Sequence, residues 1–276
     1  ISLQQLGRGC TSEVYLITDA KTGEERAAIV SVYSIENENV REKFYEKVSI
    51  MMKLKHPSIV NFIGFSETDF TKRLNPMIIT DYFPRGNLLN AIESNLNELT
   101  NTKKMIILIG VAFATQYIHS NNIILLHLYP KIANFSLARL DVPNKEKLGS
   151  DSLPYYFLAP EIVDGSKQYS KKCDVFAFGM FYYHVASGIE PTIEHNNRND
   201  FFCKIMKGEQ LPSLDEIDEK HHQVIKSLWN KDPEKRTTFD WIIDNLLHNE
   251  YECWLKDVDK NDAEVKQYIQ QFYAKF

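Results

Sequence analysis

The spacing of apolar and polar positions divides this chain into a strand-rich first third and a helical remainder. Runs rich in apolar and β-branched residues at 1–6, 13–18 and 26–32 predict three short strands. Residues 40–54 repeat their apolar positions at helical spacing, which predicts an amphipathic helix. Its apolar side chains fall on or near one face: Phe44, Val48, Met51 and Met52. The pattern therefore predicts a small β-rich portion with one packed helix.

The remainder of the chain has mostly helical patterns. A helix predicted over residues 100–121 is apolar almost all round between 105 and 118, as expected for a helix buried at the centre of a larger unit. This apolar run is too short to span a membrane. Near the C-terminus, apolar residues recur at helical spacing on a face that we expect to dock on the same domain: Val265, Tyr268, Ile269, Phe272, Tyr273 and Phe276.

Composition narrows the class of protein. The chain has 276 residues, of which 43% are hydrophobic, so it can bury a large core. A formal net charge of −5, without a cluster of Lys and Arg, argues against a nucleic-acid partner. The four cysteines form no Cys-x-x-Cys pair, so we predict neither a zinc site nor a disulfide framework and expect a reducing, cytoplasmic setting. Because the chain does not begin with Met, we expect it to be part of a longer, multidomain protein.

Two motifs resemble a known family. Residues 6–15 read Leu-Gly-Arg-Gly-Cys-Thr-Ser-Glu-Val-Tyr and resemble the glycine-rich loop of protein kinases. Residues 131–139 read Lys-Ile-Ala-Asn-Phe-Ser-Leu-Ala-Arg and match the kinase segment Lys-Ile-Ala-Asp-Phe-Gly-Leu-Ala-Arg at seven of nine positions. Further kinase-like motifs follow the family's order at residues 56–65, 77–88, 158–161, 173–180 and 232–239. The chain resembles a protein kinase domain, nearest the tyrosine-kinase-like group.

This resemblance implies an α+β, two-lobed protein kinase-like fold. Residues 1–81 would form a small N-lobe with one regulatory helix, and residues 82–249 a larger α-helical C-lobe. Residues 250–276 would be a C-terminal helical extension. Fold alone does not establish activity, which depends on the residues of the site.

Some positions would serve the architecture of the C-lobe. The resemblance implies an ion pair between Glu161 and Arg236, and we expect Asp174 to cap a buried helix. The segment that corresponds to the activation segment carries four hydroxyl residues that we expect at the surface: Ser150, Ser152, Tyr155 and Tyr156.

The residues that handle phosphate in kinases are replaced here. The Lys of the kinase motif Val-Ala-Ile-Lys falls on Val30, and its ion-pairing Glu falls on Lys47. A shift of the helix by one residue would bring Glu46 to that position, but Glu46 would still have no Lys to meet. We therefore predict that the Lys–Glu ion pair is absent.

The catalytic loop also has no counterpart in the favoured alignment, in which Ile124 is followed directly by Leu125. A competing alignment treats residues 127–129, His-Leu-Tyr, as a degenerate His-Arg-Asp. In the favoured alignment Asn134 replaces the metal-binding Asp, and a neutral amide oxygen is a weaker ligand for Mg²⁺ than a carboxylate. No intact catalytic residue and no metal site are predicted.

Adenine recognition through backbone groups could survive these losses, so ATP binding without Mg²⁺ stays open, and we predict no other cofactor. The positions that would contact a nucleotide, if binding is retained, are Leu6, Gly7, Gly9, Ser12, Val14, Ala28, Thr80, Asp81, Phe83 and Leu125.

The leading hypothesis is an inactive pseudokinase that acts as a scaffold or binding module for protein partners in intracellular signalling. One alternative is an ATP-dependent serine/threonine kinase whose catalytic loop is missing from this sequence. Another is a nucleotide-binding sensor that transfers no phosphate.

Overall fold

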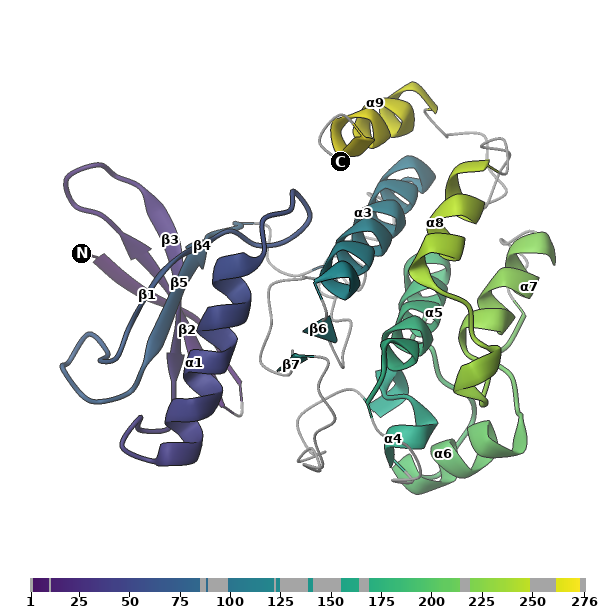
Figure 1. Cartoon of the computed structure of the whole chain (residues 1–276), viewed down its shortest axis with the longest axis horizontal. Coiled ribbons are helices and arrows are strands. Elements are labelled where there is room, and N and C mark those ends of the chain that lie inside the picture. Colours follow the sequence, from purple (N-terminus) through teal and green to yellow (C-terminus); the bar gives the residue numbers. More distant parts are fainter. Residues whose placement is uncertain are drawn as a thin grey trace. The chain divides into compact units, whose positions relative to one another are not determined.

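The chain divides into two compact units, Ile1–Gly86 and Asn87–Phe276. In this computed structural model (Figure 1), the residues described below are 2–9, 11–84, 88, 99–121, 123–124, 139–140, 155–163, 169–213, 219–248 and 262–273. The division lies five residues after the boundary expected from the sequence, and the C-terminal segment belongs to the second unit.

The first unit is built on a five-stranded antiparallel sheet with the strand order β1-β2-β3-β5-β4. Its strands are β1 (Ser2–Arg8), β2 (Ser12–Thr18), β3 (Glu25–Ser31), β4 (Phe62–Ser66) and β5 (Met77–Asp81). The three strands predicted near the N-terminus are confirmed within two residues at each end. We did not predict β4 as a strand, because Gly64 interrupts its apolar pattern.

Helix α1 (Glu38–Lys53) lies alongside this sheet (Figure 1). The Asn37 side chain caps it by accepting a hydrogen bond from the backbone N–H of Val40. The predicted amphipathic face is confirmed except for Met52, which is 59% exposed because it lies off the stripe that packs inward. The buried residues of the helix are Phe44, Val48, Ile50 and Met51.

The second unit is helical. Its α-helices are α3 (Asn101–Ser120), α4 (Pro160–Val163), α5 (Lys171–Ser187), α6 (Arg198–Lys207), α7 (Glu219–Leu228), α8 (Phe239–His248) and α9 (Asp262–Tyr273). Two single-turn helices, η4 (Tyr155–Phe157) and η5 (Pro233–Lys235), and a short ladder of β6 (Ile123–Ile124) with β7 (Arg139–Leu140) complete its described elements. The small sheet unit and the helical unit together confirm the two-lobed kinase-like fold.

Helix α5 forms the centre of this second unit, since its residues 173–186 are all buried. Helices α3 and α7 both pack on it, and α8 packs on α3 (Figure 1). Helix α9 packs on α3 through Val265 and Ile269, which are 0% and 5% exposed. The prediction that the C-terminal apolar face docks on its own domain is therefore confirmed for these two residues. Tyr268 is half-buried, and the side chains of Phe272, Tyr273 and Phe276 lie outside the described part. Within the described segments, no helix combines the length and the apolar character needed to cross a bilayer.

Candidate functional site

The glycine-rich loop is the turn between β1 and β2. Gly7 pairs opposite Val14 across the hairpin, and the backbone N–H of Gly9 donates to the carbonyl of Ser12 at 2.8 Å. A Cβ atom added at Gly7 would meet no atom within 4 Å, and one added at Gly9 would meet only the Ser12 carbonyl oxygen, at 3.6 Å. Neither glycine has a positive φ. The packing and backbone conformation of this unit therefore do not require glycine at either position.

The other predicted nucleotide positions differ widely in exposure. Ala28 and Thr80 are buried in the sheet, at 0% and 3% exposed, whereas Leu6 and Phe83 are 41% and 46% exposed. The backbone N–H of Asp81 already donates to the Asn61 carbonyl at 3.2 Å. Ser12 and Val14 are half-buried on β2, and Leu125 lies outside the described residues.

Val30 lies on β3, at the position that the sequence resemblance assigns to the phosphate-binding Lys of kinases. Its side chain is 7% exposed, and the β3 register places it opposite Glu13 on β2 and Met77 on β5. The Glu13 carboxylate is engaged elsewhere, since it accepts from the Tyr15 hydroxyl at 2.7 Å and lies 3.4 Å from the Arg8 guanidinium. Val30 is thus a packed apolar residue of the sheet.

Lys47 lies on the inward face of α1, because it shares the helical spacing of the buried residues Phe44, Val48 and Met51. Its side chain is half-buried, and this burial lowers the pKa of its ammonium group to about 8. Within the described part of the chain, neither Lys47 nor Glu46 has an ion-pair partner. The first unit therefore holds an apolar residue where the family cation is expected and a partly desolvated cation where its carboxylate is expected.

In the second unit, β6 and β7 flank the segment in which the resemblance predicts the catalytic groups, and the two strands pair with each other. Ile123 pairs with Leu140 and Ile124 with Arg139, so the ladder closes a segment of fourteen residues, 125–138. Asn134 and His127 lie in that segment, outside the described residues, and both alignments of the junction stay predictions. In sequence the segment has no Asp or Glu. Among the described residues, no group of three His, Cys, Asp or Glu side chains could hold a metal ion.

The ion pair expected between Glu161 and Arg236 is present. Two parallel hydrogen bonds of 2.7 and 2.8 Å join the guanidinium to the carboxylate, and the residues are 4% and 2% exposed. The Cys173 thiol donates to the same carboxylate over 3.4 Å. Burial and the nearby Glu161 charge raise the pKa of Cys173 to about 12, so the thiol is not a nucleophile at neutral pH.

Asp174 does not cap α5 as we predicted. The cap is Ser170, whose hydroxyl accepts from the Lys172 backbone N–H at 3.2 Å. Asp174 lies inside the first turn with its side chain fully buried, where its carboxylate is 2.8 Å from Nε2 of His119 at the end of α3. The prediction was wrong because Ser170 sits one residue before the helix and competes better for its free amides.

A sequence profile described as protein tyrosine and serine/threonine kinase matches residues 1–246. The chain belongs to the protein kinase family. Within the described residues, this kinase domain has a buried ion pair between Glu161 and Arg236, and Val30 is a buried apolar residue of its sheet.

Individual kinases resemble the domain at moderate identity. The mouse cytoplasmic tyrosine-protein kinase BMX is 30% identical over 216 residues, which cover 73% of this chain and 32% of BMX. The Dictyostelium discoideum protein named probable serine/threonine-protein kinase gdt4 is 28% identical over 241 residues, covering 80% of this chain and 14% of the relative. The Arabidopsis thaliana protein named probable serine/threonine-protein kinase SIS8 is 24% identical over 260 residues, covering 88% and 24%. The kinase domain thus spans less than a third of these relatives.

Two tyrosines of the kinase domain that we expected at the surface are packed instead. Tyr156 is 8% exposed, and its hydroxyl donates to Glu190 at 3.0 Å. The Tyr155 hydroxyl lies 2.5 Å from Nε2 of His195, whose Nδ1 lies 2.6 Å from the Ile193 carbonyl oxygen. These tyrosines help to anchor η4 to the helical core. The other two predicted surface residues, Ser150 and Ser152, lie outside the described part.

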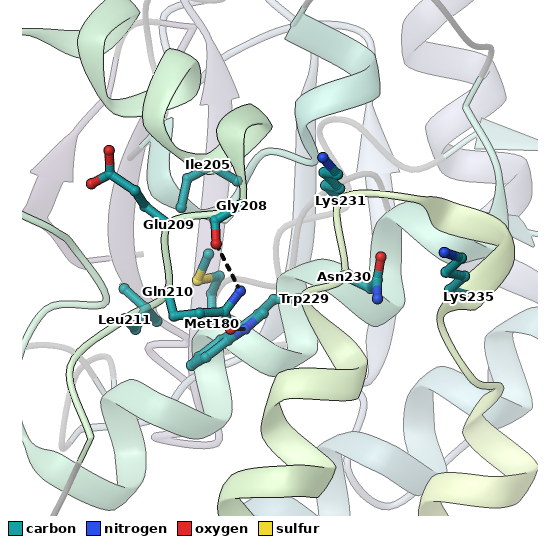
Figure 2. A pocket seen from close by; sticks show the side chains of 10 residues that line it. All are labelled: Met180, Ile205, Gly208, Glu209, Gln210, Leu211, Trp229, Asn230, Lys231 and Lys235. Carbon is teal, nitrogen blue, oxygen red and sulfur yellow. Dashed lines mark hydrogen bonds between the residues drawn. The ribbon is translucent and has the colours of Figure 1, made fainter.

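A pocket in the second unit escaped the sequence analysis. It lies beside the C-terminal ends of α6 and α7, and Trp229 and Lys231 are among its lining residues (Figure 2). These residues come from separate segments and share no periodicity or motif, so no pattern in the sequence could have grouped them.

Proposed function

We propose that this kinase domain is a pseudokinase that transfers no phosphate and serves as a scaffold or binding module in a larger cytoplasmic signalling protein. The observation that carries the proposal is that two positions of the small lobe lack the charged groups expected of a kinase. Val30 is packed where a cation should hold phosphate, and Lys47 is half-buried where its acidic partner should be.

Phosphoryl transfer depends on positioning and on neutralising charge around the transferred phosphate. The Lys–Glu pair, the metal-binding carboxylate and the general base each contribute to that task in kinases. Here these roles fall on Val30, Lys47 and Asn134, and the sequence offers no Asp or Glu between Ile123 and Arg139 that could act as base. Because the losses occur at separate positions, a single compensating change would not restore catalysis.

The parts of the domain that maintain its shape are preserved by contrast. Glu161 and Arg236 are fully paired, and α5 is buried along its length. A chain that loses its reactive groups but keeps its architecture is suited to binding other proteins. The similarity to kinases that are more than twice as long supports a role within a multidomain signalling protein. We propose protein partners rather than nucleic acid because the chain is acidic overall.

A second candidate is a nucleotide sensor that binds ATP without Mg²⁺. It is favoured by Gly7, where an added Cβ would meet no atom within 4 Å, and by Gly9, where it would meet only the Ser12 carbonyl oxygen, at 3.6 Å. A backbone free of Cβ atoms can approach phosphate closely, and its N–H groups can donate to it.

Phosphotransfer assays test the main proposal. Purified domain is incubated with radiolabelled ATP, with Mg²⁺ or Mn²⁺, and with general protein substrates for serine/threonine and tyrosine kinases. We expect no incorporation above the level of a parallel Lys47→Met preparation. If the parent domain incorporates label, and either Lys47→Met or a Gly7→Ala/Gly9→Ala variant incorporates less, the kinase activity is intrinsic to this chain. That result would refute the pseudokinase proposal.

The active-enzyme alternative has its own test. Trypsin releases residues 105–131 as one peptide, which spans the junction of Ile124 and Leu125. A mass equal to that of the printed sequence supports the deletion of the catalytic loop. Additional mass within this peptide, in protein isolated from its natural source, would favour the serine/threonine kinase.

A further inference from the structure

A cavity of about 220 Å³ lies in the second unit, where the ends of α6 and α7 meet the central helix (Figure 2). Three segments of the chain form its apolar wall. Helix α5 contributes Met180, residues 205–211 contribute Ile205 and Leu211, and Trp229 follows α7. Pockets for drug-sized ligands usually measure about 300–1,000 Å³. This cavity is therefore too small for a nucleotide-sized cofactor and has room for one or two amino-acid side chains.

The walls of the pocket are fixed before any ligand binds. The indole Nε1 of Trp229 donates to Oε1 of Gln210 at 2.8 Å, and Nε2 of Gln210 donates to the Gly208 carbonyl at 3.3 Å. On the other wall, Nε of Arg236 donates to the Asn230 carbonyl at 2.6 Å. Because Arg236 is itself held by Glu161, this wall is tied to the buried ion pair. A preformed pocket loses little conformational entropy when a ligand enters.

The polar side of the pocket is rich in hydrogen-bond donors. Oδ1 of Asn230 accepts from the Asp232 backbone N–H at 3.0 Å, and its amide Nδ2 has no partner among the described residues. Lys235 is exposed, and its ammonium group has no partner in the described part either. The ammonium of Lys231 lies 3.4 Å from the Met206 carbonyl, a long and weak contact.

The one carboxylate among the lining residues lies apart from these donors. Figure 2 shows Glu209 on the side of the pocket opposite to Lys231 and Lys235. The donor side is therefore complementary to a negatively charged group, although the whole chain carries a net charge of −5.

We propose that this pocket is a docking site for an acidic peptide segment of a partner protein. One large apolar side chain of the segment packs against Trp229 and Leu211, while neighbouring Asp or Glu carboxylates bind Asn230, Lys231 and Lys235. The inference rests on the proposed scaffold function in one respect, namely that the peptide belongs to a signalling partner. The pocket itself does not depend on whether the domain binds a nucleotide.

Peptide binding tests the inference on the intact 276-residue chain. A fluorescein-labelled peptide series carries Leu, Phe or Trp at the centre, flanked by two Glu on either side, in an otherwise Gly/Ser sequence. We expect at least one member to bind saturably by fluorescence anisotropy, and to lose at least tenfold in affinity when its central residue becomes Ala. Affinity is also expected to fall as salt rises, because exposed charges supply part of it.

A matched pair of charge variants locates the binding. Lys231→Glu/Lys235→Glu should weaken the best peptide at least tenfold, whereas Lys21→Glu/Lys266→Glu changes the net charge equally at exposed lysines elsewhere and should leave binding within twofold. Absence of binding by every peptide, or equal loss in both variants, would overturn the inference. These outcomes are independent of the phosphotransfer assay, so the docking site and the pseudokinase can fail separately.

Discussion

The guanidinium of Arg236 and the carboxylate of Glu161 form a bidentate ion pair that is almost completely removed from solvent. The remaining donors of Arg236 also find partners, including the Asn230 carbonyl at 2.6 Å and the Lys172 carbonyl at 3.0 Å. Its guanidinium lies 4.9 Å from the centre of the Phe176 ring. One side chain thus links α4, α5 and the segment before η5.

Breaking this pair should strongly destabilise the helical unit. In Arg236→Leu the Glu161 carboxylate is left buried without its partner, which typically costs about 3–5 kcal/mol of unfolding free energy. Thermal unfolding should show a decrease of roughly 6–20 °C. The control is Arg41→Leu, which removes an exposed ion pair with Glu38 of 3.2 Å and should cost less than about 1 kcal/mol. Similar losses in both variants would contradict the structural role assigned to Arg236.

The sequence predicted the architecture well because local signals and packing agree in most elements. Thr100 caps α3 where the apolar pattern begins, and Gly188 ends α5 in the left-handed conformation. The errors arise where a tertiary contact decided the outcome. Asp174 looked like a cap but is buried against His119, and Tyr155 looked exposed but contacts His195, forty residues away. No local pattern encodes such contacts.

The candidate site could be predicted only in part for a similar reason. The motif predicts that Val30 stands where kinases carry their phosphate-binding Lys. The desolvation of Lys47 is not readable, because it depends on which face of α1 packs inward. The pocket beside Trp229 needs three separate segments, so it becomes visible only in the folded chain.

The stability of the fold should decrease in acid because of His56. This side chain is 9% exposed, and its Nδ1 accepts from the Ser58 backbone N–H at 3.1 Å. Burial lowers its pKa from 6.5 to about 4. Between these two values the unfolded chain binds the proton and the folded chain does not, so stability falls as pH decreases from 6.5 to 4, by at most about 3 kcal/mol. Denaturant unfolding across this range should show that His56→Asn removes this part of the loss. An unchanged pH dependence in the variant would refute the assignment.

Lys47 should give a pH dependence of the same sign as His56, but in the alkaline range. Its folded pKa of about 8 lies below the ordinary value of 10.5, so the folded state disfavours the charged form. Stability should therefore rise between pH 8 and 10.5, and Lys47→Met should be more stable than the parent at pH 7 by about 1–3 kcal/mol. The difference should shrink towards pH 10.5. Lys53→Met, at an exposed position of the same helix, should change stability by less than about 0.5 kcal/mol. A destabilised Lys47→Met would mean that the ammonium makes a favourable interaction.

Substitution of Gly7 and Gly9 should affect ligand binding without affecting folding stability. Gly7→Ala and Gly9→Ala should change the unfolding free energy by less than about 1 kcal/mol, because neither has a positive φ or a close neighbour. Gly23→Ala is the contrasting control and should cost about 1–2 kcal/mol, since its φ is +71°. If the domain binds ATP under this loop, calorimetry should show weaker binding in Gly7→Ala and Gly9→Ala with stability unchanged. If all variants bind ATP with equal affinity, Gly7 and Gly9 do not contribute to a nucleotide site.

The proposal that this domain has no working metal–phosphate site is tested most directly by one measurement, a thermal-shift titration of the purified domain with ATP in the presence and absence of Mg²⁺. A ligand at about 100 times its dissociation constant stabilises the folded state by roughly 2.7 kcal/mol, which raises the midpoint by several degrees in a chain of this size. We predict that Mg²⁺ adds nothing to the response, whether ATP alone binds or not. A midpoint that rises only when Mg²⁺ accompanies ATP would show that a working metal–phosphate site persists, and the domain would then have to be regarded as a kinase.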